Sequence, residues 1–301
     1  MKVDFLTLAN NHILDQGEQG LQSTIFELEK NGIAYAGVGD DLNQAAKPHI
    51  ETVGNKKIGI YCCAEHEFSI ATQKSCGANP FDPLVSLDHI SSLKSQTDYV
   101  IVLFHAGKEH YRYPTPNLQK TCRKIAEKGA DLVICQHSHC IGCEEKYQSS
   151  TIVYGQGNFL FDLSSNEFWN TSLLILLEDN NQISYIPIIK NGNAVRLAKG
   201  VQATEILEAF KNRSTEILQP EIIEQKYKQF ASEFLADYLL NLRGTKMGLF
   251  FRVINKLSRQ KYKNIYIDRK YNKKAKLAIE NIIGCEAHRE LLLHALRSKN
   301  N

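Results

Sequence analysis

The sequence contains no apolar run approaching the roughly 20 residues that a membrane-spanning helix needs. No secretory signal precedes its first apolar segment, so we expect a cytoplasmic protein. Hydrophobic residues at 43% and charged residues at 23% have ordinary globular values, so disorder is not expected to dominate. With 301 residues, the chain is long enough for one sizeable domain and a smaller one.

The chain also lacks the cysteine arrangement of an iron–sulfur protein. Cys135, Cys140 and Cys143 follow a C-x4-C-x2-C pattern, but Cys135 lies inside an apolar segment and no fourth cysteine is placed to complete a cluster. We interpret the cysteines as free thiols in a reducing compartment, which agrees with an intracellular location.

The segment DLVICQHSHC, residues 131–140, ends a short apolar run in a His-x-His pair. Side chains two positions apart lie on the same side of an extended backbone, so His137 and His139 can converge on one point. Neutral imidazole is a common ligand of zinc, iron and manganese. The pair therefore indicates a metal site.

Two further segments have the same pattern, an apolar run that ends in polar residues and a histidine. Residues 4–12 end in His12, and residues 99–105 end in His105, which is followed by Glu109. Ligands in open α/β sheets gather outside the carboxyl ends of the strands, so these side chains are expected to lie together. The alternative for each histidine alone is an ordinary core or loop residue.

At this point the chain resembles the CapA-type capsule and poly-γ-glutamate synthesis proteins, a branch of the calcineurin-like metallophosphoesterases. The resemblance covers roughly residues 3–189 and rests on ANNHILDQGEQGL, FHAGKEHYRYPTP, GADLVICQHSHCIG and YGQGNFLFD. It implies an α/β/β/α sandwich, hydrolysis of a phosphate ester assisted by manganese, iron or zinc ions, and partners among the polymer-synthesis proteins. Cys135 and Gln136 depart from the Gly-His that usually precedes the final pair.

The resemblance also implies roles for individual residues. His12 would be the general acid, and Asp15, three residues later, could hold it in its cationic form. Glu109 could orient a ligand imidazole or touch substrate. The expected metal ligands are Asn11, His105, His137 and His139, and the expected substrate-binding residues are Asn10, Glu109 and Asn158.

Two carboxylate motifs of calcineurin-like sites precede the Asn-His segment, and only nine residues precede Asn10 here. We therefore expect a fold truncated at its N-terminus, in which Asn11, His105 and His137 serve one metal and His139 alone serves a second. A dinuclear centre would need carboxylates from elsewhere. The alternative function is a catalytically inactive adaptor of a polymer synthesis or export complex.

The chain changes character near Arg196, which predicts a CapA-like domain over residues 1–198 and a basic helical extension over 199–301. Residues 201–301 contain 19 Lys and Arg against 11 Asp and Glu, a net charge of +8, whereas residues 1–200 contain 17 against 22, a net charge of −5. We interpret the extension first as a solvated helical surface and second as a surface for an anionic inner membrane face; nucleic acid is not expected as a partner. The strands before residue 151 alternate with helices, and those after it are predicted to be antiparallel.

Overall fold

A computed structural model describes residues 2–161, 167–242, 249–259, 261–284 and 288. The chain divides into two compact units, residues 1–225 and 226–301, and each is described by itself. The predicted domain boundary after residue 198 is a statement about which parts fold independently. The division into compact units does not test it, so it stays a prediction.

A six-stranded sheet with the order β4-β5-β7-β8-β10-β9 forms the centre of the first unit. Its four inner strands run parallel and are apolar along most of their length, as expected for strands buried on both faces. The prediction that the strands after residue 151 are antiparallel holds for the last three strands, but β10 pairs in parallel with β8 as well as antiparallel with β9. The strands are β4 (His49–Val53), β5 (Lys56–Ala64), β7 (Tyr99–His105), β8 (Leu132–Cys135), β9 (Glu144–Tyr147) and β10 (Ser150–Tyr154).

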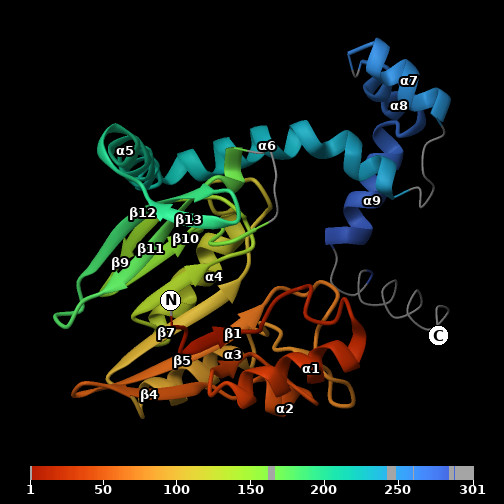
Figure 1. The fold of residues 1–301 in the computed structure, drawn as a ribbon. Helices are drawn as coiled ribbons and strands as arrows, with labels where there is room; N and C mark the ends of the chain where they lie inside the picture. The colour runs from red at the N-terminus through yellow and green to blue at the C-terminus, as the bar shows by residue number, and fades with distance from the viewer. Residues whose placement is uncertain (1, 162–166, 243–248, 260, 285–287, 289–301) are drawn as a thin grey trace. The chain divides into compact units, whose positions relative to one another are not determined.

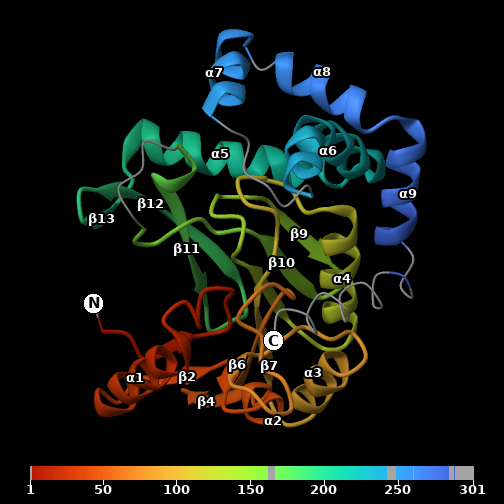
Figure 2. The same cartoon turned by 90° about the vertical axis from the view of Figure 1, so that its right-hand side faces the viewer.

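Helices α3 (Ser86–Lys94) and α4 (Pro116–Glu127) cover one face of this sheet (Figure 2). Ile90 of α3 and Ile125 of α4 are fully buried against strand residues such as Val100. Helix α4 begins where the Thr115 side chain accepts the backbone N–H of Leu118, and its proline occupies the first turn. The two helices therefore close the core on this side.

The opposite face of the sheet carries a second β layer that consists of two separate sheets (Figure 1). One pairs β1 (Phe5–Thr7) with β2 (Ala34–Ala36) in parallel. The other is the predicted antiparallel meander of β11 (Thr171–Leu177), β12 (Ile183–Asn191) and β13 (Ala194–Leu197). Leu103 of β7 packs against two core clusters, one that includes Ala36 of β2 and one against which the meander residue Ile175 also packs. Both sheets therefore pack on the same face of the central sheet.

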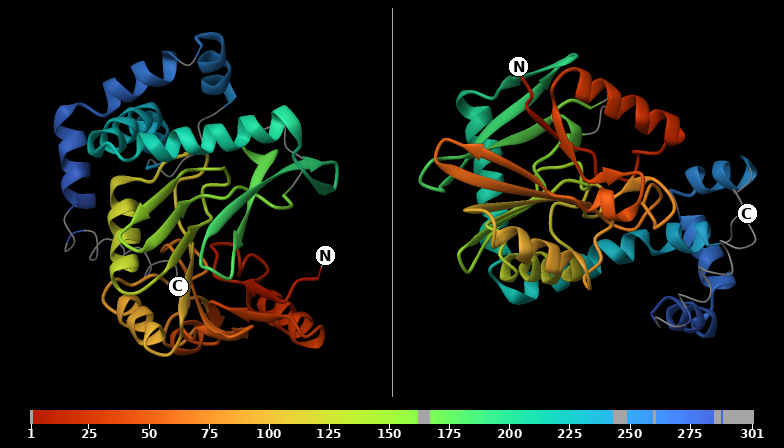
Figure 3. Two further views of the ribbon diagram at one scale, coloured as in Figure 1. Left: turned by 90° about the vertical axis from the view of Figure 1, so that its left-hand side faces the viewer. Right: turned by 90° about the horizontal axis from the view of Figure 1, so that it is seen from below.

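Helix α1 (Gly17–Lys30) covers the β1–β2 sheet on its outer side, where Leu21 and Leu28 pack against Leu8. Seen from below, α1 lies on the opposite side of the strands from α3 and α4, which confirms the expected α/β/β/α layer order (Figure 3). Helix α5 (Gly200–Glu216) packs Phe210 against Leu173 of the meander. The smaller elements are α2 (Leu42–Ala45), β3 (Val38–Gly39), β6 (Gly77–Ala78) and the 3-10 turn η1 (Glu167–Trp169).

The described cysteines are free thiols, as the sequence predicts. Cys135, Cys140 and Cys143 are buried, and burial raises the pKa of the Cys143 thiol above its usual value. The Cys122 and Cys135 sulfur atoms are 3.6 Å apart on facing elements α4 and β8. These thiols therefore behave as small core side chains.

The described part of the second unit is helical. It contains the later part of α6 (Pro220–Asn241), α7 (Leu249–Leu257), α8 (Lys261–Lys270) and α9 (Lys273–Gly284). These helices agree with the helical extension that the sequence predicts; of its residues after 284, the structure describes residue 288 alone. Phe251 contacts Tyr262 and Tyr266, and Lys263 pairs with Asp237 at 2.8 Å. Within the described residues, no helix combines the length and apolarity that crossing a membrane requires.

Candidate functional site

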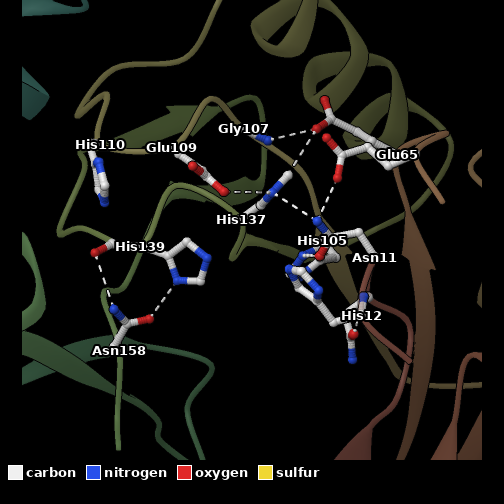
Figure 4. A network of polar contacts seen from close by, with 12 residues as sticks. Asn11, His12, Glu65, His105, Gly107, Glu109, His110, His137, His139 and Asn158 are labelled. Atoms are coloured by element: carbon white, nitrogen blue, oxygen red, sulfur yellow. Dashed lines mark hydrogen bonds and ion pairs between the residues drawn. The ribbon is translucent and has the colours of Figure 1, made fainter. Parts of the chain in front are cut away.

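The predicted site residues lie on loops at the carboxyl ends of strands. Asn11 follows β1, His105 is the last residue of β7, and His137 follows β8. Strands β7 and β8 are parallel neighbours, so their carboxyl ends meet at one edge of the sheet. Figure 4 shows the side chains of these residues converging from three segments that are far apart in the sequence.

The Asn11 side chain contacts the imidazoles of both His105 and His137. Its side-chain oxygen accepts a hydrogen bond from His105 Nε2 at 3.0 Å, and its nitrogen lies 3.5 Å from His137 Nε2. The two rings stack with centroids 4.7 Å apart. Asn11 and His137 are 5% and 6% exposed, so this group of polar atoms is largely shielded from water.

Burial lowers the pKa of His105 to about 3, and the nearby His137, His139 and His12 lower it further in the same direction. His105 is therefore neutral at physiological pH, which leaves one ring nitrogen with a lone pair. His137 Nδ1 is buried and has no hydrogen-bond partner among the described residues. The nearest carboxylate oxygen, Oε2 of Glu65, is 3.6 Å from it.

His12 is more exposed than the other histidines of the site. Its Nδ1 is 2.8 Å from Asp15, and both side chains are more than half exposed. Asn10 holds the turn itself, because its side-chain oxygen accepts the His12 backbone N–H at 2.9 Å and its nitrogen donates to Leu8 O at 3.3 Å. The expected His12–Asp15 pair is formed, and the Asn10 side chain is engaged with the local backbone.

His139 lies apart from the Asn11 group. Its ring centroid is 6.1 Å from that of His137, and its Nδ1 contacts Asn158 Oδ1 at 2.8 Å. Asn158 also donates to His139 O at 3.4 Å, which supports a backbone that adopts a positive φ of 54°. The predicted substrate residue Asn158 thus orients the ring of His139.

An aromatic cluster borders His139. Phe161 and Trp169 pack against the His139 ring and against each other, at centroid distances of 5.0, 6.3 and 4.8 Å for the three pairs. Trp169 Nε1 donates to His110 Nε2 at 3.0 Å, so His110 belongs to the site border. The sequence did not identify His110 as part of the site, because nothing in it indicates that η1 would pack on this residue.

Three carboxylates reach the Asn11 group. Glu109 Oε1 is 3.8 Å from His137 Nε2, so the predicted Glu109 lies beside a candidate ligand. The other two, Glu65 and Glu67, were not identified from the sequence. They follow β5, a parallel neighbour of β7, and the apolar run of β5 ending in charged residues is the same pattern that identified the other loops.

The residues present fit one divalent cation rather than two. Ligands that bind a cation at roughly 2.0–2.2 Å lie about 3–3.5 Å from each other, and Asn11 Oδ1 is 3.0 Å from His105 Nε2. The contact of Asn11 with His137 is made by the amide nitrogen, which is not a metal ligand. His139 is separated from this group and bonded to Asn158. Within the described residues, no three His, Cys, Asp or Glu side chains form a preformed ligand group.

Residues 1–163 match the family described as the bacterial capsule synthesis protein PGA_cap. The PGA biosynthesis protein CapA of Bacillus subtilis is 31% identical over 166 residues, a match that covers 54% of this chain and 43% of that protein. The capsule biosynthesis protein CapA of Bacillus anthracis is 29% identical, covering 52% and 40%. A probable polyglutamine synthesis accessory protein of Mycobacterium tuberculosis is 30% identical, covering 56% and 49%. The chain thus spans less than half the length of these relatives.

Some solved structures are similar to part of the chain. A putative 5′-nucleotidase from Staphylococcus aureus has 14% identity and a TM-score of 0.41, covering 69% of this chain and 41% of that chain. A phosphatase from Mycoplasma pneumoniae has 13% identity and a TM-score of 0.37, covering 68% and 75%.

Proposed function

Because the chain belongs to the PGA_cap family of bacterial capsule synthesis proteins, we propose that it takes part in making a bacterial surface polymer, poly-γ-glutamate or a polysaccharide. Its partners in this proposal are the polymer-synthesis proteins, and its location is the cytoplasm. The names of its relatives, which refer to capsule, PGA and polyglutamine synthesis, support the proposal.

The proposed chemistry is metal-dependent hydrolysis of a phosphoester. The observation that carries it is the convergence of Asn11, His105 and His137 on one shielded point. A divalent cation held there supplies Lewis-acid polarisation of a phosphoryl oxygen. His12 lies at the exposed side of the same loop and is oriented through Nδ1 by Asp15, so its Nε2 is available to give a proton to the leaving oxygen.

Manganese titration and phosphoester turnover test this function in the 301-residue chain. We expect one Mn²⁺ per chain by isothermal calorimetry, and cleavage of a chromogenic phosphoester only when Mn²⁺ is present. His12→Ala is expected to keep Mn²⁺ binding and to slow turnover by roughly 10²- to 10⁴-fold, the usual effect of removing a general acid.

His49→Ala, on the edge strand β4, is the matched control and should leave turnover unchanged. A chain that binds Mn²⁺ but cleaves no phosphoester would contradict the hydrolase and favour the inactive adaptor. Two bound ions per chain would contradict the single-cation site.

The extension suggests a second property, contact with an anionic membrane surface. Helix α7 exposes the apolar side chains Val253 and Leu257 to 48% and 79%, and the exposed Lys256 lies beside them. Apolar and cationic groups on one short helix are suited to an interface of anionic lipid, where each Lys or Arg near the surface contributes about 1 kcal/mol. This supports a position of the protein at the inner membrane face.

Vesicle sedimentation tests the membrane contact. The full chain is expected to bind vesicles that contain phosphatidylserine, to bind pure phosphatidylcholine vesicles at least tenfold more weakly, and to dissociate as salt is raised. Leu257→Glu should weaken binding because it adds an anion to the apolar side, whereas Leu197→Glu, an exposed leucine of β13, is the control. Equal binding of both variants would exclude α7 as the contact.

A further inference from the structure

A cavity of about 660 Å³ lies within the second unit, where side chains of α6, α7 and α8 meet. Its volume is in the range of roughly 300–1,000 Å³ that is usual for small-molecule sites. Four of its lining residues are cationic and one is anionic: Arg252, Lys256, Arg259 and Lys263 against Asp237. The lining therefore carries a formal net charge of +3, four positive charges against one negative charge.

The ion pair of Lys263 with Asp237 fixes one wall of this cavity. Lys263 Nζ is 2.8 Å from both carboxylate oxygens of Asp237, and the Lys263 side chain is only 11% exposed. The Lys263 backbone N–H donates to Asn255 Oδ1 at 2.9 Å, which ties the start of α8 to α7. Asp237 thus neutralises Lys263, and the other three cations account for the net charge of the lining.

These three cations come from α7 and the turn that follows it. Arg252 and Lys256 are four residues apart and lie on the same face of α7, and Arg259 follows two residues after the helix ends. Within the described residues, no carboxylate forms an ion pair with Lys256 or Arg259. Like charges that are held around one cavity repel each other, so a bound anion would stabilise this arrangement.

The cavity also has apolar lining residues, Leu240 of α6 and Phe251 of α7. The Phe251 ring packs against Tyr262 and Tyr266 of α8, with centroids 5.2 and 5.5 Å apart, so its position is fixed by the neighbouring helix. A lining that combines cations with apolar side chains suits an anionic group attached to an organic body.

We propose that this cavity binds the phosphate group of a phosphate monoester. Such a group carries about −1.5 to −2 charges at neutral pH and offers three acceptor oxygens, so it matches several cations better than a single carboxylate does. The same group occurs in soluble esters and in the headgroup of phosphatidic acid, and the experiment below separates these two sources. The proposal is independent of the phosphoester hydrolysis proposed for the first unit, because the cavity lies in the second.

Calorimetric titration of the full chain with glycerol 3-phosphate tests the soluble source. EDTA is present, so that a cation in the first unit cannot contribute, and glycerol is the uncharged control probe. Lys256→Gln and Arg259→Gln each remove one cation from the cavity and are expected to weaken binding at least fivefold. Lys270→Gln removes the same charge from an exposed position of α8 outside the lining, so it should bind as the unchanged chain does.

Sedimentation with phosphatidylcholine vesicles that contain phosphatidic acid tests the lipid source, with pure phosphatidylcholine vesicles as the control. Circular dichroism checks that each variant is folded. Vesicle binding that both Gln variants in the cavity weaken and Lys270→Gln does not, without binding of the soluble ester, would support the cavity and assign its phosphate to a lipid.

Three results would overturn the proposal. The first is an unchanged chain that binds neither probe, and the second is a pair of cavity variants that bind both probes within twofold of the unchanged chain. The third is tighter binding of a γ-linked glutamate trimer than of glycerol 3-phosphate through the same cations, which would make the ligand a polycarboxylate.

Discussion

His137→Ala should lower Mn²⁺ affinity by at least 100-fold while the chain remains folded. Among the described histidines, His137 is the one whose ring lies near Asn11, Glu65 and Glu109 at the same time, within 3.5 to 3.8 Å of each. Its removal takes away one of the two imidazoles of the proposed cation site. Calorimetry at pH 7.5 measures the affinity, and circular dichroism measures the fold.

His139→Ala is the matched control, because it removes an imidazole from the same loop. We expect it to change Mn²⁺ affinity by less than about threefold, since His139 is bonded to Asn158 and lies apart from the Asn11 group. Equal losses in the two variants would show that both histidines serve one cation or a coupled pair. Unchanged affinity in His137→Ala would place the cation elsewhere.

Gly142→Ala should destabilise the first unit by more than the roughly 1–3 kcal/mol that is typical of an overpacked position. A Cβ at Gly142 would lie 1.8 Å from Tyr154 O and 2.7 Å from Tyr154 C, both backbone atoms of β10. Gly142 also donates its N–H to Gly155 O at 2.9 Å. A methyl group therefore forces the loop that carries His139 away from the end of β10.

Urea unfolding followed by circular dichroism measures this loss. Gly192→Ala is the control, because no atom beyond the two neighbouring residues lies within 4 Å of a Cβ at that position. Its φ of 61° makes alanine unfavourable there, so a loss of about 1 kcal/mol is expected. If Gly142→Ala were no less stable than Gly192→Ala, the close approach to β10 would be wrong.

The strand-end pattern predicts the positions of Asn11, His105 and His137 because parallel strands with apolar cores end together. The carboxylates were harder to predict. The segment from Glu65 to residue 83 has little periodicity, so its path cannot be predicted from the sequence. Its contacts depend on Ser69 and Gly107, which bond across the fold and leave no periodic signal in the sequence.

Other differences also have tertiary causes. The run that begins at Thr151 reads as part of the antiparallel meander, yet β10 inserts between β8 and β9 because its apolar residues fill that position on both faces. Helix α8 carries many charges, and its helical signal is weak. Its buried Ile267 and the ion pair of Lys263 with Asp237 stabilise it within the second unit.

The division of the second β layer has a mechanical consequence for the site. Asn11 and His12 are attached to the β1–β2 sheet, whereas Trp169 precedes the meander strand β11. Among the described residues, the named strands of these two sheets share no backbone hydrogen bonds. Each sheet therefore packs separately on the central sheet. A shift of one sheet relative to the other would therefore change side-chain contacts and would leave the strand ladders intact. A ligand that contacts residues attached to both sheets would hold the two sheets in a fixed relative position.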